Sequence, residues 1–146
     1  MIDITTKKDV YREAVAVGRI RLKRETIQRI LRKETLKGDV LEIAKIAGIM
    51  AAKKTSELIP LTHQIPLTNV SIEFNIGEDY IEVRSIVSTV YKTGVEIESL
   101  VAVAVTLITI WDMIKEYEKD EKGQYPEIKI DEIKIERKFK NNTSYH

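Results

Sequence analysis

Two runs of alternating apolar and polar side chains occupy residues 67–90, and Gly77-Glu78-Asp79 separates them. A period of two places the apolar side chains of each run on one face of a strand. A short connection that contains glycine is typical of the turn between two antiparallel strands. The segment therefore predicts a β-hairpin.

Two further strands are predicted near the ends of the chain. Residues 12–22, REAVAVGRIRL, alternate well enough to predict a first strand with an irregularity near Gly18. Residues 127–139, EIKIDEIKIERKF, predict a last strand. The apolar set of this strand slips by one residue at Asp131-Glu132, which indicates a β-bulge.

Three segments predict helices. Residues 24–34 have the pattern of a short helix with Ile27, Ile30 and Leu31 on one face. A long helix is expected over about residues 95–118, because the apolar stretch there is followed by charged residues, glycine and proline.

The middle helix is expected to begin after Asp39, which is a good N-cap, and to run to about residue 58. Its small side chains allow another backbone to come close: Ala44, Ala47, Gly48, Ala51 and Ala52. The next segment, residues 59–66, has a proline at or near each end and predicts a stiff, extended loop.

The order strand, two helices, two strands, helix, strand resembles the split βαβ arrangement of a ferredoxin-like sandwich. We therefore expect an α+β fold, an antiparallel sheet with helices packed on one face. A length of 146 residues with 43% hydrophobic side chains fits one domain over residues 1–146. Only residues 1–9 and 140–146 look like loose termini.

Composition excludes several classes of protein. A net charge of +1 provides no global field for nucleic acid or an anionic membrane, so neither is expected as a partner. The absence of cysteine rules out disulfides, thiolate metal sites and thiol nucleophiles. The longest apolar stretch, residues 100–114, is shorter than the roughly 20 residues that a membrane helix needs, and it contains Asp112. With no signal peptide at the polar N-terminus, a cytoplasmic protein is expected.

Lys37-Gly38-Asp39 combines a positive charge, a turn and the start of a helix, which are the ingredients of a phosphate site. An ordinary exposed loop lysine is the alternative. His63 lies in the proline-flanked loop and could shuttle a proton near neutral pH, or could simply bond a nearby carbonyl.

Asp112 ends the most apolar stretch, where a carboxylate is costly unless it is paired or used, and Lys115 follows one turn later. A functional pair and a modest surface ion pair both remain open. Glu98 and Asp112 are separated by about 21 Å along an ideal helix, so one subunit cannot bring both to a small reacting group. Either the ligand is elongated or a second copy completes the site. For Arg12, Arg84, Lys92 and Lys53-Lys54, a solvated face is the safer interpretation.

Two runs, KGDVLEIAKIAGIMAAKKTSELIPLTHQIPL and KTGVEIESLVAVAVTLITIWDMIK, closely resemble the signature blocks of the MoaC family, the cyclic pyranopterin monophosphate synthases. The resemblance spans about residues 10–140. It implies conversion of 3′,8-cyclo-7,8-dihydroguanosine triphosphate to cyclic pyranopterin monophosphate with release of pyrophosphate, in molybdenum cofactor biosynthesis. It also implies a homohexamer, a trimer of dimers, with the site at a subunit interface.

Matched to the family's motifs, the catalytic set comprises Asp112, Lys37 and Lys115. The substrate-binding set comprises Leu61, Thr62, His63, Glu96, Ile97, Glu98 and Arg12. The reaction needs proton transfers, for which a carboxylate, a histidine or a lysine with a lowered pKa could serve. No cofactor or dedicated metal cage is expected, although Mg²⁺ could accompany the substrate triphosphate.

Thr62 and Gln64 stand where many relatives have cysteine and proline, and Ile97 stands where many have methionine. Neither change removes a residue to which we assign proton transfer. An RNA-binding module of ferredoxin-like fold is a rival interpretation, but Phe74 is the one aromatic residue well inside the predicted hairpin strands, Tyr80 and Tyr91 only flank them, and the net charge is nearly neutral. A non-catalytic oligomeric relative that binds a nucleotide or pterin is the second rival.

Overall fold

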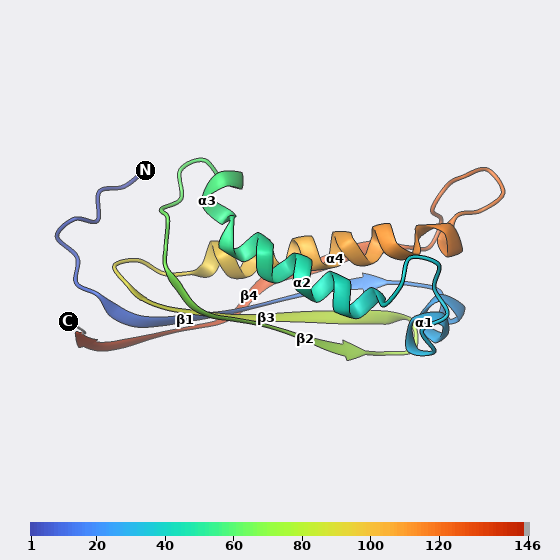
Figure 1. Ribbon diagram of the computed structural model, residues 1–146, viewed down its shortest axis with the longest axis horizontal. Coiled ribbons are helices and arrows are strands. Elements are labelled where there is room, and N and C mark those ends of the chain that lie inside the picture. The colour runs from blue at the N-terminus through green and yellow to red at the C-terminus, as the bar shows by residue number, and fades with distance from the viewer. Residues whose placement is uncertain (145–146) are drawn as a thin grey trace.

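The computed structural model describes residues 1–144 as one layer of helices on a four-stranded sheet (Figure 1). The elements follow in the order β1 (Val10–Arg21), α1 (Arg24–Leu31), α2 (Val40–Lys53), α3 (Thr55–Leu58), β2 (Leu67–Ile76), β3 (Tyr80–Tyr91), α4 (Glu96–Glu118) and β4 (Lys129–Ser144). The predicted α+β, ferredoxin-like arrangement is confirmed.

The sheet has the order β2-β3-β1-β4, and every neighbouring pair is antiparallel. The predicted hairpin is confirmed: Ile76 pairs with Ile81, and the Gly77 N–H donates to the Tyr80 carbonyl at 2.9 Å. Because β1 lies between β3 and β4, the chain must cross the sheet twice. The helices in these crossovers cover the same face, where the core lies (Figure 1).

Gly18 and the predicted bulge occur at the same place. Between the pairs Val17–Lys134 and Arg19–Asp131, the residues Glu132 and Ile133 stand opposite Gly18 alone. Glu132 has a φ of 59°, as the irregular backbone of a bulge requires. A Cβ atom on Gly18 would lie 2.8 Å from side-chain atoms of Val103 and Leu107, so glycine here lets α4 pack closely on the sheet.

The small residues of α2 face α4, as the composition of that helix indicates. Ala44, Gly48, Ala51 and Ala52 are buried, and a Cβ atom on Gly48 would collide with the Thr106 hydroxyl of α4 and lie 3.0 Å from the Ala102 carbonyl. The two helices therefore approach each other at a distance that only glycine permits at the crossing point.

The predicted boundaries were wrong at the ends of two helices. The first helix ends at Leu31 rather than at residue 34, because Lys33 adopts a φ of 57° that breaks the helix. Leu31 is 52% exposed, and the buried face of α1 consists of Thr26, Ile27 and Ile30. The second helix breaks at Lys54, and its last turn forms the separate α3.

The termini differ from each other. Residues 1–9 contain no strand or helix. The prediction of a loose segment from residue 140 was wrong as far as residue 144. Strand β4 continues to Ser144 along the whole length of β1, and Ser144 pairs with Val10. Residues 145–146, the rest of that expected segment, lie outside the described part of the chain.

Helix α4 has 23 residues and is long and apolar enough to cross a membrane by length and composition alone. Half of its most apolar 18-residue window is buried in the fold. Ala102, Val103, Leu107 and Ile110 belong to the core between α4, α2 and the sheet, as expected of a core helix.

Candidate functional site

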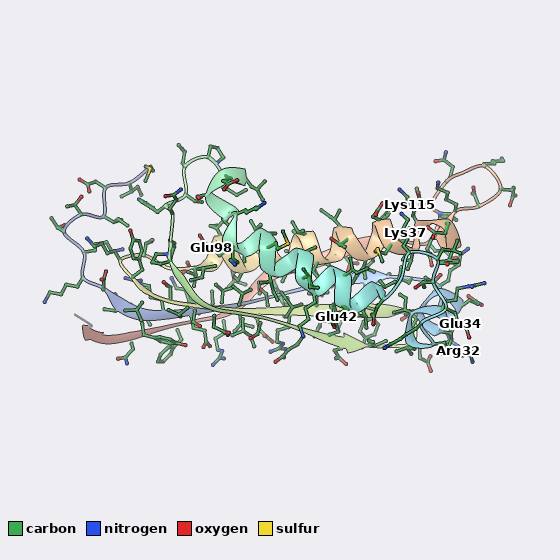
Figure 2. The ribbon with its side chains drawn as sticks, in the orientation of Figure 1. Arg32, Glu34, Lys37, Glu42, Glu98 and Lys115 are labelled. Carbon is green, nitrogen blue, oxygen red and sulfur yellow. The ribbon has the colours of Figure 1, made fainter. Side chains whose placement is uncertain are left out.

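The C-terminal half of α4 brings together three charged side chains, Lys37, Asp112 and Lys115 (Figure 2). The Lys115 ammonium lies 3.0 Å from Asp112 Oδ1. The Lys37 ammonium lies 3.4 Å from Asp112 Oδ2 and donates to the Asp112 main-chain carbonyl at 2.9 Å. One carboxylate thus holds two ammonium groups side by side on an open surface, where the three side chains remain 39–58% exposed.

Local sequence places two of these groups and a tertiary contact places the third. Asp112 and Lys115 are three residues apart on α4, so they share one face. Lys37 comes from the α1–α2 connection, where Gly38 has a φ of 103° and Asp39 caps α2 by accepting from the Glu42 N–H at 3.3 Å. Lys37 therefore reaches across to α4, while the Asp39 carboxylate occupies the N-terminus of α2.

The charges of this cluster reinforce one another. The hydrogen bond and the charge of Asp112 raise the pKa of Lys115. The hydrogen bond and charge of Lys115, with the charge of Lys37, lower the pKa of Asp112. Lys115 is therefore not a lysine with a lowered pKa. The cluster consists of two ammonium groups and one carboxylate. This arrangement can bind an anion and stabilise negative charge that develops on it.

An apolar cavity of about 390 Å³ adjoins the pair Asp112 and Lys115. Its walls are Ile108, Trp111, Tyr125 and Ile130, and the rings of Trp111 and Tyr125 meet edge to face with their centroids 5.4 Å apart. Sequence reasoning missed both aromatic residues. Trp111 stands next to Asp112 and could have been noticed, but nothing in the sequence indicates that Tyr125, from the connection after α4, folds back onto it.

The N-terminal end of α4 carries three of the other predicted residues, Glu96, Ile97 and Glu98. Glu98 is buried, and this burial, with a smaller contribution from the charge of Glu96, raises its pKa, while the charge of His63 opposes the shift. Glu96 pairs with Lys138 at 3.1 Å. A buried carboxyl with a raised pKa, near a second carboxylate and an imidazole, is suited to proton transfer.

His63 makes the carbonyl contact that was left open as its alternative role. Its Nε2 lies 2.7 Å from the Ile2 carbonyl, and because a carbonyl oxygen can only accept, Nε2 is the donor. Arg12 donates to the main-chain carbonyls of Tyr91 and Lys92 at 3.2 and 3.3 Å. The imidazole and the guanidinium therefore both lie at this end of the molecule, bonded to backbone.

The last three predicted residues at this end, Leu61, Thr62 and Ile97, carry no charge. Leu61 is 69% exposed, and Ile97 is 39% exposed in the first turn of α4. The Thr62 hydroxyl donates to the Ile59 carbonyl at 2.8 Å and so holds the loop. Outside this set, Arg84 pairs with Glu136 at 2.7 Å, and Lys53 and Lys54 are exposed, in agreement with solvated charges.

The predicted residues form two clusters rather than one. Glu98 lies at one end of the helical layer, and Lys37 and Lys115 lie at the other (Figure 2). Glu98 and Asp112 are 14 positions apart within the continuous helix α4, which separates the two by about 21 Å. The distance expected from the sequence is therefore confirmed, and one copy of the chain does not bring the clusters together.

Comparisons with known proteins give a consistent result. The sequence matches the MoaC family over residues 1–141. It is 57% identical over 144 residues to a protein of Pyrococcus furiosus, covering 99% of this chain and 92% of that protein. It is 58% identical over 140 residues to a protein of Saccharolobus solfataricus, covering 96% and 94%, and 56% identical over 140 residues to one of Thermococcus kodakarensis, covering 96% and 90%. Each of the three is named "Probable cyclic pyranopterin monophosphate synthase".

Proposed function

This chain belongs to the MoaC family, and we propose that it is a cyclic pyranopterin monophosphate synthase of molybdenum cofactor biosynthesis. The proposed substrate is the small molecule implied by the sequence motifs, the cyclised GTP derivative with its triphosphate. The observation that carries the proposal is the cluster of Lys37 and Lys115 around Asp112, because two fixed ammonium groups suit a polyphosphate.

We assign the charged cluster to the phosphate chemistry. When the cyclic phosphate closes, a substrate hydroxyl gives up its proton to water and attacks the α-phosphorus, the bond from that phosphorus to the bridging oxygen breaks, and pyrophosphate leaves. The negative charge that grows on the leaving group would be stabilised by Lys37 and Lys115, which Asp112 holds in place. Protonated Lys115, whose pKa is raised, can act as a donor but not as a base.

We assign the proton transfers of the ring rearrangement to the opposite cluster. Glu98, whose pKa burial raises, can hold a proton closer to neutral pH than an ordinary carboxyl group. The charges of His63 and Glu96 act on Glu98, so three ionisable groups lie at this end of α4, where the ring system would be bound. Leu61, Thr62, Ile97 and Arg12 would shape the pocket around the ring system.

Magnesium, if it takes part, would enter with the substrate. Within residues 1–144, no group of three or more histidine, aspartate or glutamate side chains is placed to hold a metal ion. The triphosphate oxygens would then provide the ligands, which is the usual way in which proteins use Mg²⁺. The steps proposed above do not depend on it.

A second copy of the chain would unite the two clusters. The adjacent helices α2 and α4 expose five large apolar side chains: Ile43, Ile46, Met50, Ile97 and Ile108. Exposed apolar side chains gathered on two adjacent helices are typical of an interface. We propose a homo-oligomer, assembled as a hexamer from three dimers, in which Glu98 of one copy faces Lys37 and Asp112 of another. We also propose that the protein works in the cytoplasm.

The shared site can be tested by mixing inactive variants. In a random mixture of Lys37→Ala and Glu98→Gln subunits, about a quarter of the shared sites would carry both native side chains, so activity should return. Lys37→Ala mixed with Asp112→Asn is the matched control, because both residues come from the same copy, and this mixture should stay inactive. Restoration in neither mixture, from subunits that do exchange, would show that the clusters act separately.

The activity itself is tested by turnover. Wild-type protein, Lys37→Ala and Asp112→Asn would be incubated with the cyclised GTP derivative while pyrophosphate and cyclic pyranopterin monophosphate are measured. Product from wild type alone is the expected result. Folded wild-type protein that binds this compound and releases it unchanged would instead support the non-catalytic binding protein.

A further inference from the structure

Lys37 belongs to the connection between α1 and α2, residues 32–39, and no side chain of this connection is buried. Seven of its eight residues are exposed, and Leu36, its one large apolar residue, is 83% exposed. Apolar burial is the main force that fixes a segment on a fold, and here it contributes almost nothing. The position of Lys37 therefore depends on directional contacts.

One such contact comes from Tyr117 of α4. The Leu36 N–H donates to the Tyr117 hydroxyl at 2.8 Å, and the next residue, Lys37, reaches Asp112 on the same helix. Within residues 1–144, the hydrogen bonds that join this connection to α4 are those of Leu36 and Lys37. The other backbone bonds of the connection join it to itself, to the end of α1 or to the start of α2, as from Gly38 to Thr35, from Glu34 to Arg29 and from Ile43 to Asp39.

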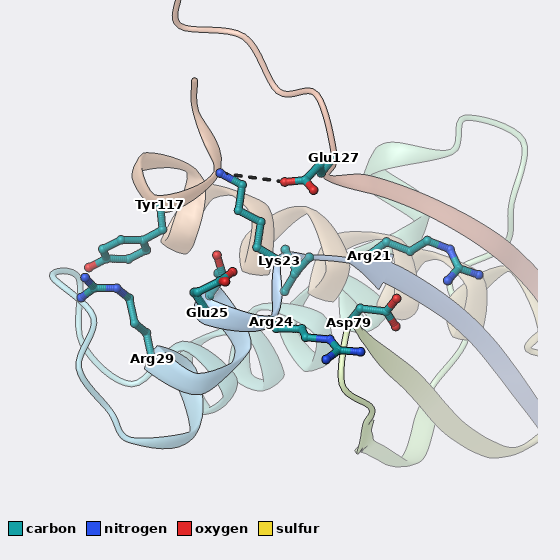
Figure 3. A pocket seen from close by; sticks show the side chains of 10 residues that line it. Arg21, Lys23, Arg24, Glu25, Arg29, Asp79, Tyr117 and Glu127 are labelled. Atoms are coloured by element: carbon teal, nitrogen blue, oxygen red, sulfur yellow. Dashed lines mark ion pairs between the residues drawn. The ribbon is translucent and has the colours of Figure 1, made fainter. Parts of the chain in front are cut away.

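Arg29 of α1 links the same ring to the same connection. Its guanidinium lies 4.7 Å from the centre of the Tyr117 ring, and its Nη1 donates to the Glu34 carbonyl at 3.4 Å. Figure 3 shows Arg29 reaching from α1 to Tyr117 at the edge of a cavity of about 950 Å³. A cation over an aromatic ring fixes the orientation of both. The tyrosine is thus held by Arg29 while it holds Leu36.

We propose that Tyr117 is a positioning residue that sets the Lys37 ammonium against Asp112, and that Arg29 supports it. The assignment rests on the proposed function, in which Lys37 stabilises charge on the substrate. Leu36 and Lys37 are consecutive, and their acceptors on α4 are five residues apart, so the helix holds the connection at two points. Without the Tyr117 hydroxyl, one of these points is lost and Lys37 samples a wider range of positions.

Tyr117→Phe is the direct test, because it removes the acceptor and leaves the ring for Arg29. Loss of one hydrogen bond that acts through Lys37 should lower kcat about 2- to 10-fold. Because Lys37→Ala is expected to form no product, additivity is read from affinity for pyrophosphate: Tyr117→Phe should weaken pyrophosphate binding in wild type and cause no further loss in Lys37→Ala, because residues that act through one another are not additive. Tyr80→Phe is the matched control: Arg19 lies 4.5 Å from the Tyr80 ring, and this variant should keep wild-type turnover.

A measurement without turnover separates this proposal from the assignment of the enzyme. Amide hydrogen exchange at Leu36 should be faster in Tyr117→Phe than in wild type and unchanged in Tyr80→Phe. Unchanged exchange at Leu36 overturns the proposal whether or not the protein is active. Faster exchange with unchanged kcat also overturns it, as does a loss of pyrophosphate affinity that adds in full to that of Lys37→Ala. If folded wild type forms no product, the proposed function fails, and the exchange rate still decides whether Tyr117 holds the connection.

Discussion

Gly48→Ala should destabilise this protein although alanine is the better helix former. In an exposed helix, this change stabilises by about 1 kcal/mol. At Gly48, however, the new methyl group would overlap the Thr106 hydroxyl and lie 3.0 Å from the Ala102 carbonyl. Neither group can move easily, because that hydroxyl donates to that carbonyl at 2.7 Å inside α4. Overpacking of this kind costs about 1–3 kcal/mol, which exceeds the gain in helix propensity over most of its range.

The free energy of unfolding can be measured by denaturant titration of wild type, Gly48→Ala, Thr106→Ala and the double variant. We expect Gly48→Ala to lose roughly 0–2 kcal/mol, the overpacking cost less the gain in helix propensity. Because Thr106→Ala removes the hydroxyl that the methyl group meets, the double variant should be more stable than the sum of the single changes predicts. Ala47→Gly is the control for propensity alone, since Ala47 is only partly buried, and it should cost about 1 kcal/mol. A Gly48→Ala protein more stable than wild type would refute the reasoning.

Three further predictions concern buried or bonded polar groups. Because burial raises the pKa of Glu98, the folded state binds the proton more tightly than the unfolded state. The free energy of unfolding of wild type should therefore fall as the pH rises above the ordinary carboxyl range. Glu98→Gln should remove this fall, and identical pH profiles of the two proteins would contradict the prediction. Glu118 is fully buried and accepts from the Lys23 N–H and the Thr26 hydroxyl at the start of α1. Glu118→Ala should therefore lower the free energy of unfolding by roughly 3 kcal/mol. A loss below about 1 kcal/mol in thermal unfolding would refute this. Deletion of residues 1–5 removes the Ile2 carbonyl that His63 bonds, so diethyl pyrocarbonate should modify His63 faster than in wild type. The rate is read by mass spectrometry of the peptide that contains His63. An equal rate would show that Ile2 does not shield the imidazole.

Features that depend on neighbouring residues could be predicted from the sequence. The hairpin, the Asp39 cap, the bulge after Asp131 and the pairing of Asp112 with Lys115 are local, because each involves residues within a few positions of one another. The 21 Å between Glu98 and Asp112 also followed from the sequence, since a continuous helix has a fixed rise per residue. The motifs are also local runs of sequence, and they were sufficient to place the chain in its family.

Features that depend on which elements meet could not be predicted in this way. Whether Leu31 is buried depends on the partner of α1, and the length of β4 depends on β1, along which it pairs as far as Ser144. Nothing near Lys37 in the sequence indicates that its ammonium bonds Asp112, 75 residues away, or that Tyr117 holds the residue before it. Periodicity determines the elements because it is a property of a few neighbouring residues. Packing decides the site, because it brings distant residues within the few ångströms over which hydrogen bonds and charges act.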